Sequence, residues 1–278
     1  MPLVSTGEIV AEAASARRGC GAFNAIQLEH ITAIIEGAAL ADAPVIVQLS
    51  QNAVRYHGAL APIGGAALAA ARAAEARVAV HLDHAESREL VREAVELGFG
   101  SVMFDASKLD YEDNVRETRE VAAYCHDHGV WVEAELGEIG GKDGVHAPGA
   151  RTDPSEAADF AAATGIDALA VAVGSSHAML TRDASLDFEL IGRLRERVPV
   201  PLVLHGSSGV PDEGLAEAVR AGMTKVNIAT QLNKVFTAAA AGDWRAHPGE
   251  VDPRKYLGAG RVAVRDEVRR LLLVLADV

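Results

Sequence analysis

The stretch VAVHLDHAES (residues 78–87) joins a β-branched apolar run to an aspartate flanked by two histidines. A short, almost continuous apolar run is typical of a parallel strand that is covered on both faces. Alternation along such a strand places His81 and Asp83 on one face, whereas His84 follows where we expect the chain to turn. The stretch therefore predicts a buried strand whose ionisable end forms either a polar turn or part of a reactive site.

Seven further apolar runs share this strand character, and each is followed by polar or glycine-rich residues and then a helical pattern. They cover residues 22–25, 44–50, 101–106, 130–136, 168–176, 201–208 and 225–230. The intervening segments, such as SRELVREAVELG, repeat apolar residues every three or four positions. Eight such units in 278 residues predict an α/β fold, a (β/α)8 TIM barrel that occupies residues 1–278 as a single domain.

The composition of the chain is acidic and poor in cysteine, and both features exclude certain classes of partner and site. Against 26 Lys and Arg stand 39 Asp and Glu, a net charge of −13, which argues against a nucleic-acid or membrane-surface binder. Cys20 and Cys125 lie far apart in sequence, so neither a disulfide framework nor a thiolate metal site is expected. The chain has no signal-peptide pattern and no apolar run near the ~20 residues that span a bilayer. We expect a soluble, cytoplasmic protein.

Ionisable and hydroxyl side chains gather at the ends of the predicted strands, where barrels of this kind place their active sites. The set comprises His81, Asp83, His84, Asp105, Glu133, Glu135, Ser175, Ser176, His177 and His205. His84, His177 and His205 end three different strands at corresponding heights, and three neutral imidazoles with an open position form a catalytic zinc site. Each histidine alone is better explained as a hydrogen-bonded turn residue, but the three together favour zinc.

Asp83 directly precedes the first of these histidines. We therefore predict that its carboxylate lies beside the metal without binding it, a position suited to a general base. His81 lies on the same face of the strand and is expected to orient its neighbours from behind rather than to bind the metal.

Three other segments have distinctive patterns. Small residues follow the last two predicted strands in HGSSGV and NIATQ, where this fold commonly binds phosphate. The glycine-rich stretch 137–154 lacks helical periodicity and is interpreted as an active-site loop, with a lid as one option. The tail from Gly242 onward is longer than one helix needs, and we expect it to close the barrel bottom or to reach a neighbouring subunit.

The chain resembles the class II (metal-dependent) ketose-bisphosphate aldolases along nearly its whole length. The matching stretches, in family order, are AFNAIQLEH, APVIVQLS, HLDH, FDAS, EAELGEIGG, AVGSSH, LVLHGSSGVPDE, TKVNIATQL and DPRKYL. The resemblance implies a lyase of carbohydrate metabolism, as in glycolysis, that forms a dimer or tetramer. Its implied reaction is the reversible cleavage of fructose or tagatose 1,6-bisphosphate to dihydroxyacetone phosphate and glyceraldehyde 3-phosphate.

The same resemblance implies roles for individual residues. The metal-binding positions of the family match His84, His177 and His205 for one catalytic Zn²⁺, with Asp105 and Glu135 for an alternative metal position. Asp83 matches the residue that exchanges the C4 hydroxyl proton, and Asp143 matches a mobile acid that serves C3 of the three-carbon fragment. The implied substrate-binding residues are Asn24, Ser50, Gly206, Ser208, Asn227, Thr230 and Arg254. In some relatives the arginine comes from a partner subunit, and a monovalent cation (Na⁺ or K⁺) joins the phosphate site.

Three positions depart from the family pattern. Ala178 stands where the family has a glycine at the phosphate and cation site, so a methyl group could crowd the phosphate there. Ala229 stands where fructose-bisphosphate enzymes carry an aspartate, which resembles the tagatose branch. Asp143 is one methylene shorter than the usual glutamate. These departures bear on the identity of the sugar.

Other functions remain open alternatives. One is cleavage of another phosphorylated sugar, such as 6-phospho-5-dehydro-2-deoxygluconate, and another is a catalytically impaired paralogue that only binds sugar phosphates. A zinc hydrolase is less favoured because such barrels place an HxH pair on strand one, where this chain has AFNA. A Schiff-base aldolase needs a lysine at the C-terminal end of a strand. We expect Lys225 to open strand eight at the wrong end and Lys142 to lie in the loop.

Overall fold

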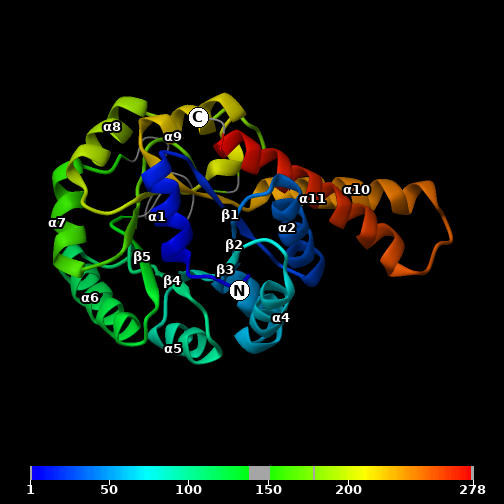
Figure 1. Ribbon diagram of the computed structural model, residues 1–278, viewed down its shortest axis with the longest axis horizontal. Helices are drawn as coiled ribbons and strands as arrows, with labels where there is room; N and C mark the ends of the chain where they lie inside the picture. Colours follow the sequence, from blue (N-terminus) through cyan, green and yellow to red (C-terminus); the bar gives the residue numbers. More distant parts are fainter. Residues whose placement is uncertain (1, 138–150, 178, 277–278) are drawn as a thin grey trace.

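The computed structural model describes residues 2–137, 151–177 and 179–276 and shows a closed barrel of eight parallel strands in sequence order (Figure 1). The strands are β1 (Cys20–Asn24), β2 (Val45–Ser50), β3 (Val78–Ala85), β4 (Ser101–Phe104), β5 (Trp131–Glu135), β6 (Ala168–Ala170), β7 (Leu202–Leu204) and β8 (Met223–Ile228). Hydrogen bonds between β8 and β1 close the ring. The predicted (β/α)8 barrel is confirmed.

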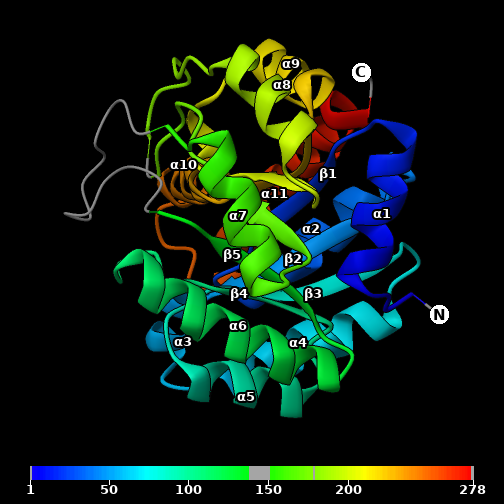
Figure 2. The same cartoon turned by 90° about the vertical axis from the view of Figure 1, so that its left-hand side faces the viewer.

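An outer layer of helices covers the strands (Figure 2). These helices are α2 (Leu28–Ala41), α4 (Leu60–Ala73), α5 (Arg88–Leu97), α6 (Tyr111–Asp127), α7 (Pro154–Thr164), α8 (Phe188–Arg197) and α9 (Asp212–Ala221). Short helices α3 (Gln51–His57) and η1 (Ser207–Gly209) follow β2 and β7. Ser87, Asp153 and Asp187 start α5, α7 and α8, since their side chains accept backbone N–H groups that lack a partner within the helix.

The N-terminal end of the barrel is closed by helix α1 (Thr6–Ala16), which lies across it (Figures 1 and 2). A capping box formed by Ser5 and Glu8 starts this helix. Ile9 and Val10 are buried against inward-facing residues of the first three strands. Of the two places expected for the C-terminal tail, the barrel bottom is therefore wrong, because α1 already covers that apolar surface.

The C-terminal tail forms a hairpin of α10 (Thr230–Ala246) and α11 (Pro253–Ala276), whose turn projects away from the barrel (Figure 1). The second half of α11 returns to the barrel and packs on α2, burying Val264 and Val268. A Cβ at Gly37 would lie 2.6 Å from the Arg265 carbonyl oxygen, so glycine permits the close approach of α2 and α11. No helix in the described ranges is long and apolar enough to cross a membrane.

Alternation along β3 separates two environments, as predicted. Val78, Val80 and Leu82 pack outward in the main core under the helices, whereas His81 and Asp83 are buried on the inner face. The barrel interior is thus polar in its upper part. This polar interior carries the side chains that position the site.

Candidate active site

A cavity of about 240 Å³ opens among the C-terminal ends of the strands. It is lined by Asn24, Ser50, Asn52, Asp83, His84, His177, His205, Gly206, Ser207, Ser208, Asn227, Ala229 and Thr230. Most of the predicted site residues therefore meet at one place. A larger cavity of about 430 Å³ lies at the other end of the barrel, beside Arg17 and Arg18, and none of the predicted site residues lines it.

The three predicted histidines converge at this cavity. Their ring centroids are 4.9 Å (His84 and His205), 5.3 Å (His84 and His177) and 5.6 Å (His177 and His205) apart. One nitrogen from each ring lies within 4.8 Å of the others. Three imidazole nitrogens at this separation fit a zinc ion with an open coordination position.

His84 reaches this position through an unusual backbone conformation. It has φ +49°, in the left-handed region, at a register shift between β3 and β4. The prediction that His84 lies past the strand is wrong, because the bulged strand continues to Ala85. A bulge turns a side chain in a new direction without ending the strand, and here it directs two consecutive residues, Asp83 and His84, toward one cavity.

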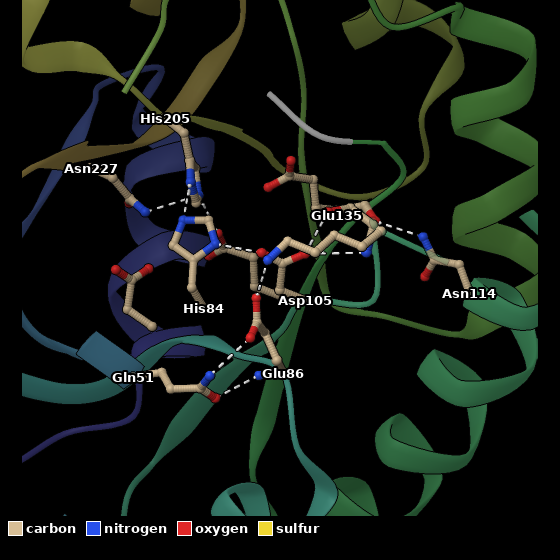
Figure 3. A network of polar contacts seen from close by, with 12 residues as sticks. Gln51, His84, Glu86, Asp105, Asn114, Glu135, His205 and Asn227 are labelled. Atoms are coloured by element: carbon tan, nitrogen blue, oxygen red, sulfur yellow. Dashed lines mark hydrogen bonds and ion pairs between the residues drawn. The ribbon is translucent and has the colours of Figure 1, made fainter. Parts of the chain in front are cut away.

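Two of the three imidazoles each donate a hydrogen bond to a carboxylate, and Figure 3 shows the pair formed by His84 and Asp105. His84 Nδ1 donates to Asp105 Oδ2 at 2.7 Å, and His205 Nε2 donates to Glu133 Oε1 at 2.8 Å. The remaining ring nitrogens, His84 Nε2 and His205 Nδ1, then face each other at 3.1 Å. Such partners fix the tautomer and the orientation of metal-binding histidines.

The histidines differ in their protonation. Burial, aided by the neighbouring His205 and His84, lowers the pKa of His177 to about 3. Burial also lowers the pKa of His205, against the opposing effect of Glu133. Burial would lower the pKa of His84 as well, but Asp83, Asp105 and Glu135 outweigh it and raise that pKa to about 10. Two neutral imidazoles therefore stand beside one that carries a proton when no metal is bound.

We predict from this difference that zinc binding releases a proton and strengthens as the pH rises. His84 is protonated below a pKa of about 10, and zinc requires the unprotonated nitrogen. Affinity should increase about tenfold per pH unit between about pH 7 and about pH 9, because one proton must leave the site. Calorimetry of zinc binding in buffers of different ionisation enthalpy measures this release, and an affinity independent of pH would contradict the charge assigned to His84.

Asp83 presents an unpartnered oxygen to the same cavity. Asn24 Nδ2 donates to Asp83 Oδ2 at 2.7 Å, and Gln48 Nε2 in turn donates to Asn24 Oδ1. The other oxygen, Oδ1, is buried and has no hydrogen-bond partner among the described residues. Burial would raise the pKa of Asp83, but His84 and His205 outweigh it and lower that pKa. The residue is a fixed, charged proton acceptor.

The opposite wall of the cavity is built from glycine, hydroxyl groups and a helix end. Gly206 has φ +66°, and a Cβ there would lie 2.6 Å from the Ser176 carbonyl group, so glycine is needed. Ser208 Oγ accepts the Gln231 backbone N–H in the first turn of α10, which begins at Thr230. Backbone N–H groups and the positive end of a helix favour an anionic group at such a wall.

Comparisons with known proteins show the family to which the chain belongs. Residues 4–277 match the family model described as fructose-bisphosphate aldolase class-II. The chain belongs to the class II fructose-bisphosphate aldolase family. The chain is 35% identical to a fructose-bisphosphate aldolase of Giardia intestinalis over 96% of this chain and 90% of that protein. These names support a class II aldolase, a lyase.

Solved structures extend the likeness of this aldolase to three dimensions. The YdjI aldolase from Escherichia coli K12 has a TM-score of 0.84 at 30% identity and covers 98% of this chain and 97% of its own. Fructose-bisphosphate aldolase from Campylobacter jejuni has a TM-score of 0.81 at 22% identity, covering 98% and 95%, which shows a shared fold.

Some predicted site residues of this class II aldolase lie elsewhere. Arg254 has a side chain that is 88% exposed, pairs with Asp252 on the α10–α11 hairpin, and does not line the cavity. Ser50 lines the cavity but also starts α3 by accepting the Ala53 N–H. Asp143, Lys142 and Ala178 lie outside the described residues.

The second predicted metal group is also assembled. His84, Asp105 and Glu135 each offer one atom within 4.8 Å of the others, so the expected alternative metal position has its ligands in reach. His81, however, forms a hydrogen bond between its Nδ1 and Ser101 Oγ at 2.8 Å. Its Nε2 lies 4.0 Å from Glu133 Oε2. Among the described residues, the polar contacts of His81 run to Ser101 and Glu133 and not to a metal-binding histidine, so His81 does not hold those histidines directly.

The sequence predicts Glu133 at a strand end without indicating a role for it, and it predicts Lys225 outside the site of this aldolase. Lys225 does not open strand eight at its end; it lies within β8, fully buried, and its ammonium group pairs with Glu133. A signal was present, since Glu133 with Glu135 and Lys225 with Asn227 are spaced by two residues. That spacing places each pair on one face of a strand, here the barrel interior.

Proposed function

We propose that the protein is a zinc-dependent aldolase that reversibly cleaves fructose or tagatose 1,6-bisphosphate to dihydroxyacetone phosphate and glyceraldehyde 3-phosphate. The observation that carries the proposal is the free, buried Oδ1 of Asp83 beside three convergent imidazoles in one cavity. A proton acceptor next to a cation site is what a retro-aldol reaction requires. Membership of the family supports the same reaction.

The metal would be held by His84, His177 and His205, whose neutral or deprotonated nitrogens suit zinc. When bound, zinc supplies a Lewis acid that stabilises the negative charge developing on the three-carbon fragment. Asp105 and Glu133 keep two of the imidazoles in the required tautomer by accepting their other N–H groups.

Asp83 acts on the C4 hydroxyl of the sugar. Its Oδ1 accepts the hydroxyl proton as the C4 oxygen forms a carbonyl group and the C3–C4 bond breaks. The electron pair of that bond passes to the three-carbon fragment, and Asp143 is proposed to deliver the proton that this fragment takes up at C3. Asn24 holds Asp83 Oδ2 throughout, so one oxygen remains directed at the substrate.

The two phosphates bind at different walls of the cavity. The C1 phosphate is assigned to the glycine and hydroxyl wall, comprising Gly206, Ser208, Asn227 and Thr230, all of which line the cavity. The C6 phosphate is assigned to Ser50 and to Arg254. A sodium or potassium ion at the C1 phosphate remains part of the proposal, on the strength of the family resemblance.

Arg254 is proposed to arrive from the hairpin of a partner subunit in a cytoplasmic homo-oligomer. The exposure of its side chain and the projecting hairpin support this arrangement (Figure 1). We predict that Arg254→Ala raises KM for a ketose bisphosphate about tenfold or more and changes kcat less, because a lost charge-assisted contact weakens ground-state binding. Steady-state kinetics measures both, with Arg245→Ala on the same hairpin as the control. An unchanged KM would place the C6 phosphate elsewhere.

The experiment that tests the function is an assay of triose-phosphate release from a panel of sugars by the zinc-loaded protein. Fructose and tagatose 1,6-bisphosphates differ only at C4. Ala229 lines the cavity where fructose enzymes carry an aspartate, which favours tagatose 1,6-bisphosphate. The alternative sugar, 6-phospho-5-dehydro-2-deoxygluconate, is included in the panel as a second candidate. Cleavage of either bisphosphate supports the proposal. Calorimetric binding of these sugars without cleavage of any would instead indicate a paralogue that binds and does not turn over.

A further inference from the structure

A lysine that the proposed reaction does not use lies fully buried inside the barrel, beneath the metal site. Lys225 Nζ donates to Glu133 Oε2 at 2.8 Å and to Asn227 Oδ1 at 2.7 Å. A buried charge is costly unless it is paired and hydrogen-bonded, and an apolar side chain of similar volume often serves a fold equally well. The role of Lys225 is therefore sought in what its two partners do.

Glu133 connects Lys225 to a metal-binding histidine. One carboxylate oxygen accepts from Lys225, and the other accepts from His205 Nε2 at 2.8 Å. With both oxygens engaged, the carboxylate cannot rotate away from the imidazole. His205 therefore keeps its proton on Nε2, which leaves Nδ1 unprotonated toward His84 and the metal position.

Asn227 connects Lys225 to the cavity. An amide side chain can present either its oxygen or its NH₂ group in a given direction, and hydrogen bonds decide which. The Lys225 ammonium group has no acceptor, so it fixes Oδ1 toward itself and turns Nδ2 the other way. Nδ2 lies 2.9 Å from His205 Nε2, but that nitrogen cannot accept a hydrogen bond while it donates its own proton to Glu133. The amide NH₂ group is therefore not engaged by His205, and Asn227 lines the cavity. An N–H donor therefore remains for a ligand.

We propose that Lys225 is a positioning residue that sets two groups of the active site at once. Through Glu133 it holds His205 in the tautomer that offers Nδ1 to zinc, and through Asn227 it directs an amide N–H into the substrate cavity. The ammonium group is not a Schiff-base nucleophile, since it is buried and held by two acceptors. This inference rests on the proposed function of the same site.

The test compares Lys225→Met with the double variant Lys225→Met/Glu133→Gln. The single variant leaves the buried carboxylate of Glu133 without its cationic partner, with only the hydrogen bond from His205. The double variant removes both charges. Cys20→Ala is the matched control, because Cys20 is buried in the same barrel and its thiol donates to the Thr224 carbonyl group of β8 rather than to a group of the proposed site. Zinc dissociation constants come from competition with a chromophoric chelator, and thermal unfolding is recorded on the metal-free proteins. Kinetics are measured at saturating zinc.

We expect Lys225→Met to weaken zinc binding ~10- to 100-fold, as the loss of partners behind metal-binding histidines does. The double variant should recover thermal stability but not zinc affinity, because the new amide can present either end to His205. At saturating zinc both variants should show a KM raised more than kcat is lowered, since Asn227 is free to turn its amide. Cys20→Ala should bind zinc as the wild type does. If Lys225→Met fails to fold, the zinc affinity and KM of the double variant alone test the inference.

Wild-type zinc affinity and KM in the double variant would overturn the inference and leave Lys225 a structural residue only. If the double variant recovered zinc affinity together with thermal stability, that result would also overturn the inference. A wild-type protein that binds no zinc would overturn the proposed function and this inference together. The two failures are therefore distinguishable from the wild-type titration alone.

Discussion

Asp83→Ala should retain zinc and lose ketose-bisphosphate cleavage by ~10²-fold or more, the usual effect of removing a positioned acid or base. The residue is held by Asn24 and keeps Oδ1 free toward the cavity. Its carboxylate is not among the groups whose atoms could jointly hold a metal within the described residues. The loss should therefore fall on the chemical step.

The measurement for Asp83→Ala pairs a zinc titration with a triose-phosphate assay. Asp127→Ala, an exposed aspartate at the end of α6, is the matched control and should change neither quantity. Loss of zinc by Asp83→Ala would show that the carboxylate is a ligand, and retention of full activity would show that another group takes the C4 proton.

His205→Ala should lose both zinc and activity. The imidazole supplies one of the three converging nitrogens and is the one held by Glu133. Removing the carboxylate behind a metal-binding histidine costs ~10- to 100-fold in metal affinity, and removing the histidine itself should cost more. Cleavage should fall with zinc occupancy, because the Lewis acid is lost.

The control for His205→Ala is His247→Ala, since His247 is exposed near the end of α10. Zinc content by elemental analysis and cleavage rate should drop together in the first variant and stay unchanged in the second. Full zinc content in His205→Ala would contradict the three-histidine site.

Much of the fold and the site could be predicted because both follow local rules. Strand-like runs that alternate with helical segments predict a parallel barrel, and the ends of those strands meet at one face. His84, His177 and His205 were therefore predicted to converge from their positions at strand ends, and their ring nitrogens do so. The identity of the sugar and the role of Asp143 remain predictions.

The remainder depended on contacts between segments far apart in sequence. Glu133 and Lys225 are 92 residues apart, and their pairing requires the register of the closed barrel. The bulge that turns His84 inward leaves no mark in HLDH. Helix α1 closes the barrel because Ile9 and Val10 pack against apolar side chains at the end of the strands. The sequence of a short amphipathic segment does not show where that segment packs.

The central claim is that this barrel cleaves a ketose bisphosphate with zinc held by His84, His177 and His205. The most direct test removes all metal from the wild-type protein with a chelator and measures triose-phosphate release from fructose and tagatose 1,6-bisphosphates before and after zinc is returned. We expect the metal-free protein to be inactive and one equivalent of zinc per chain to restore cleavage. Undiminished cleavage by the metal-free protein would contradict the account.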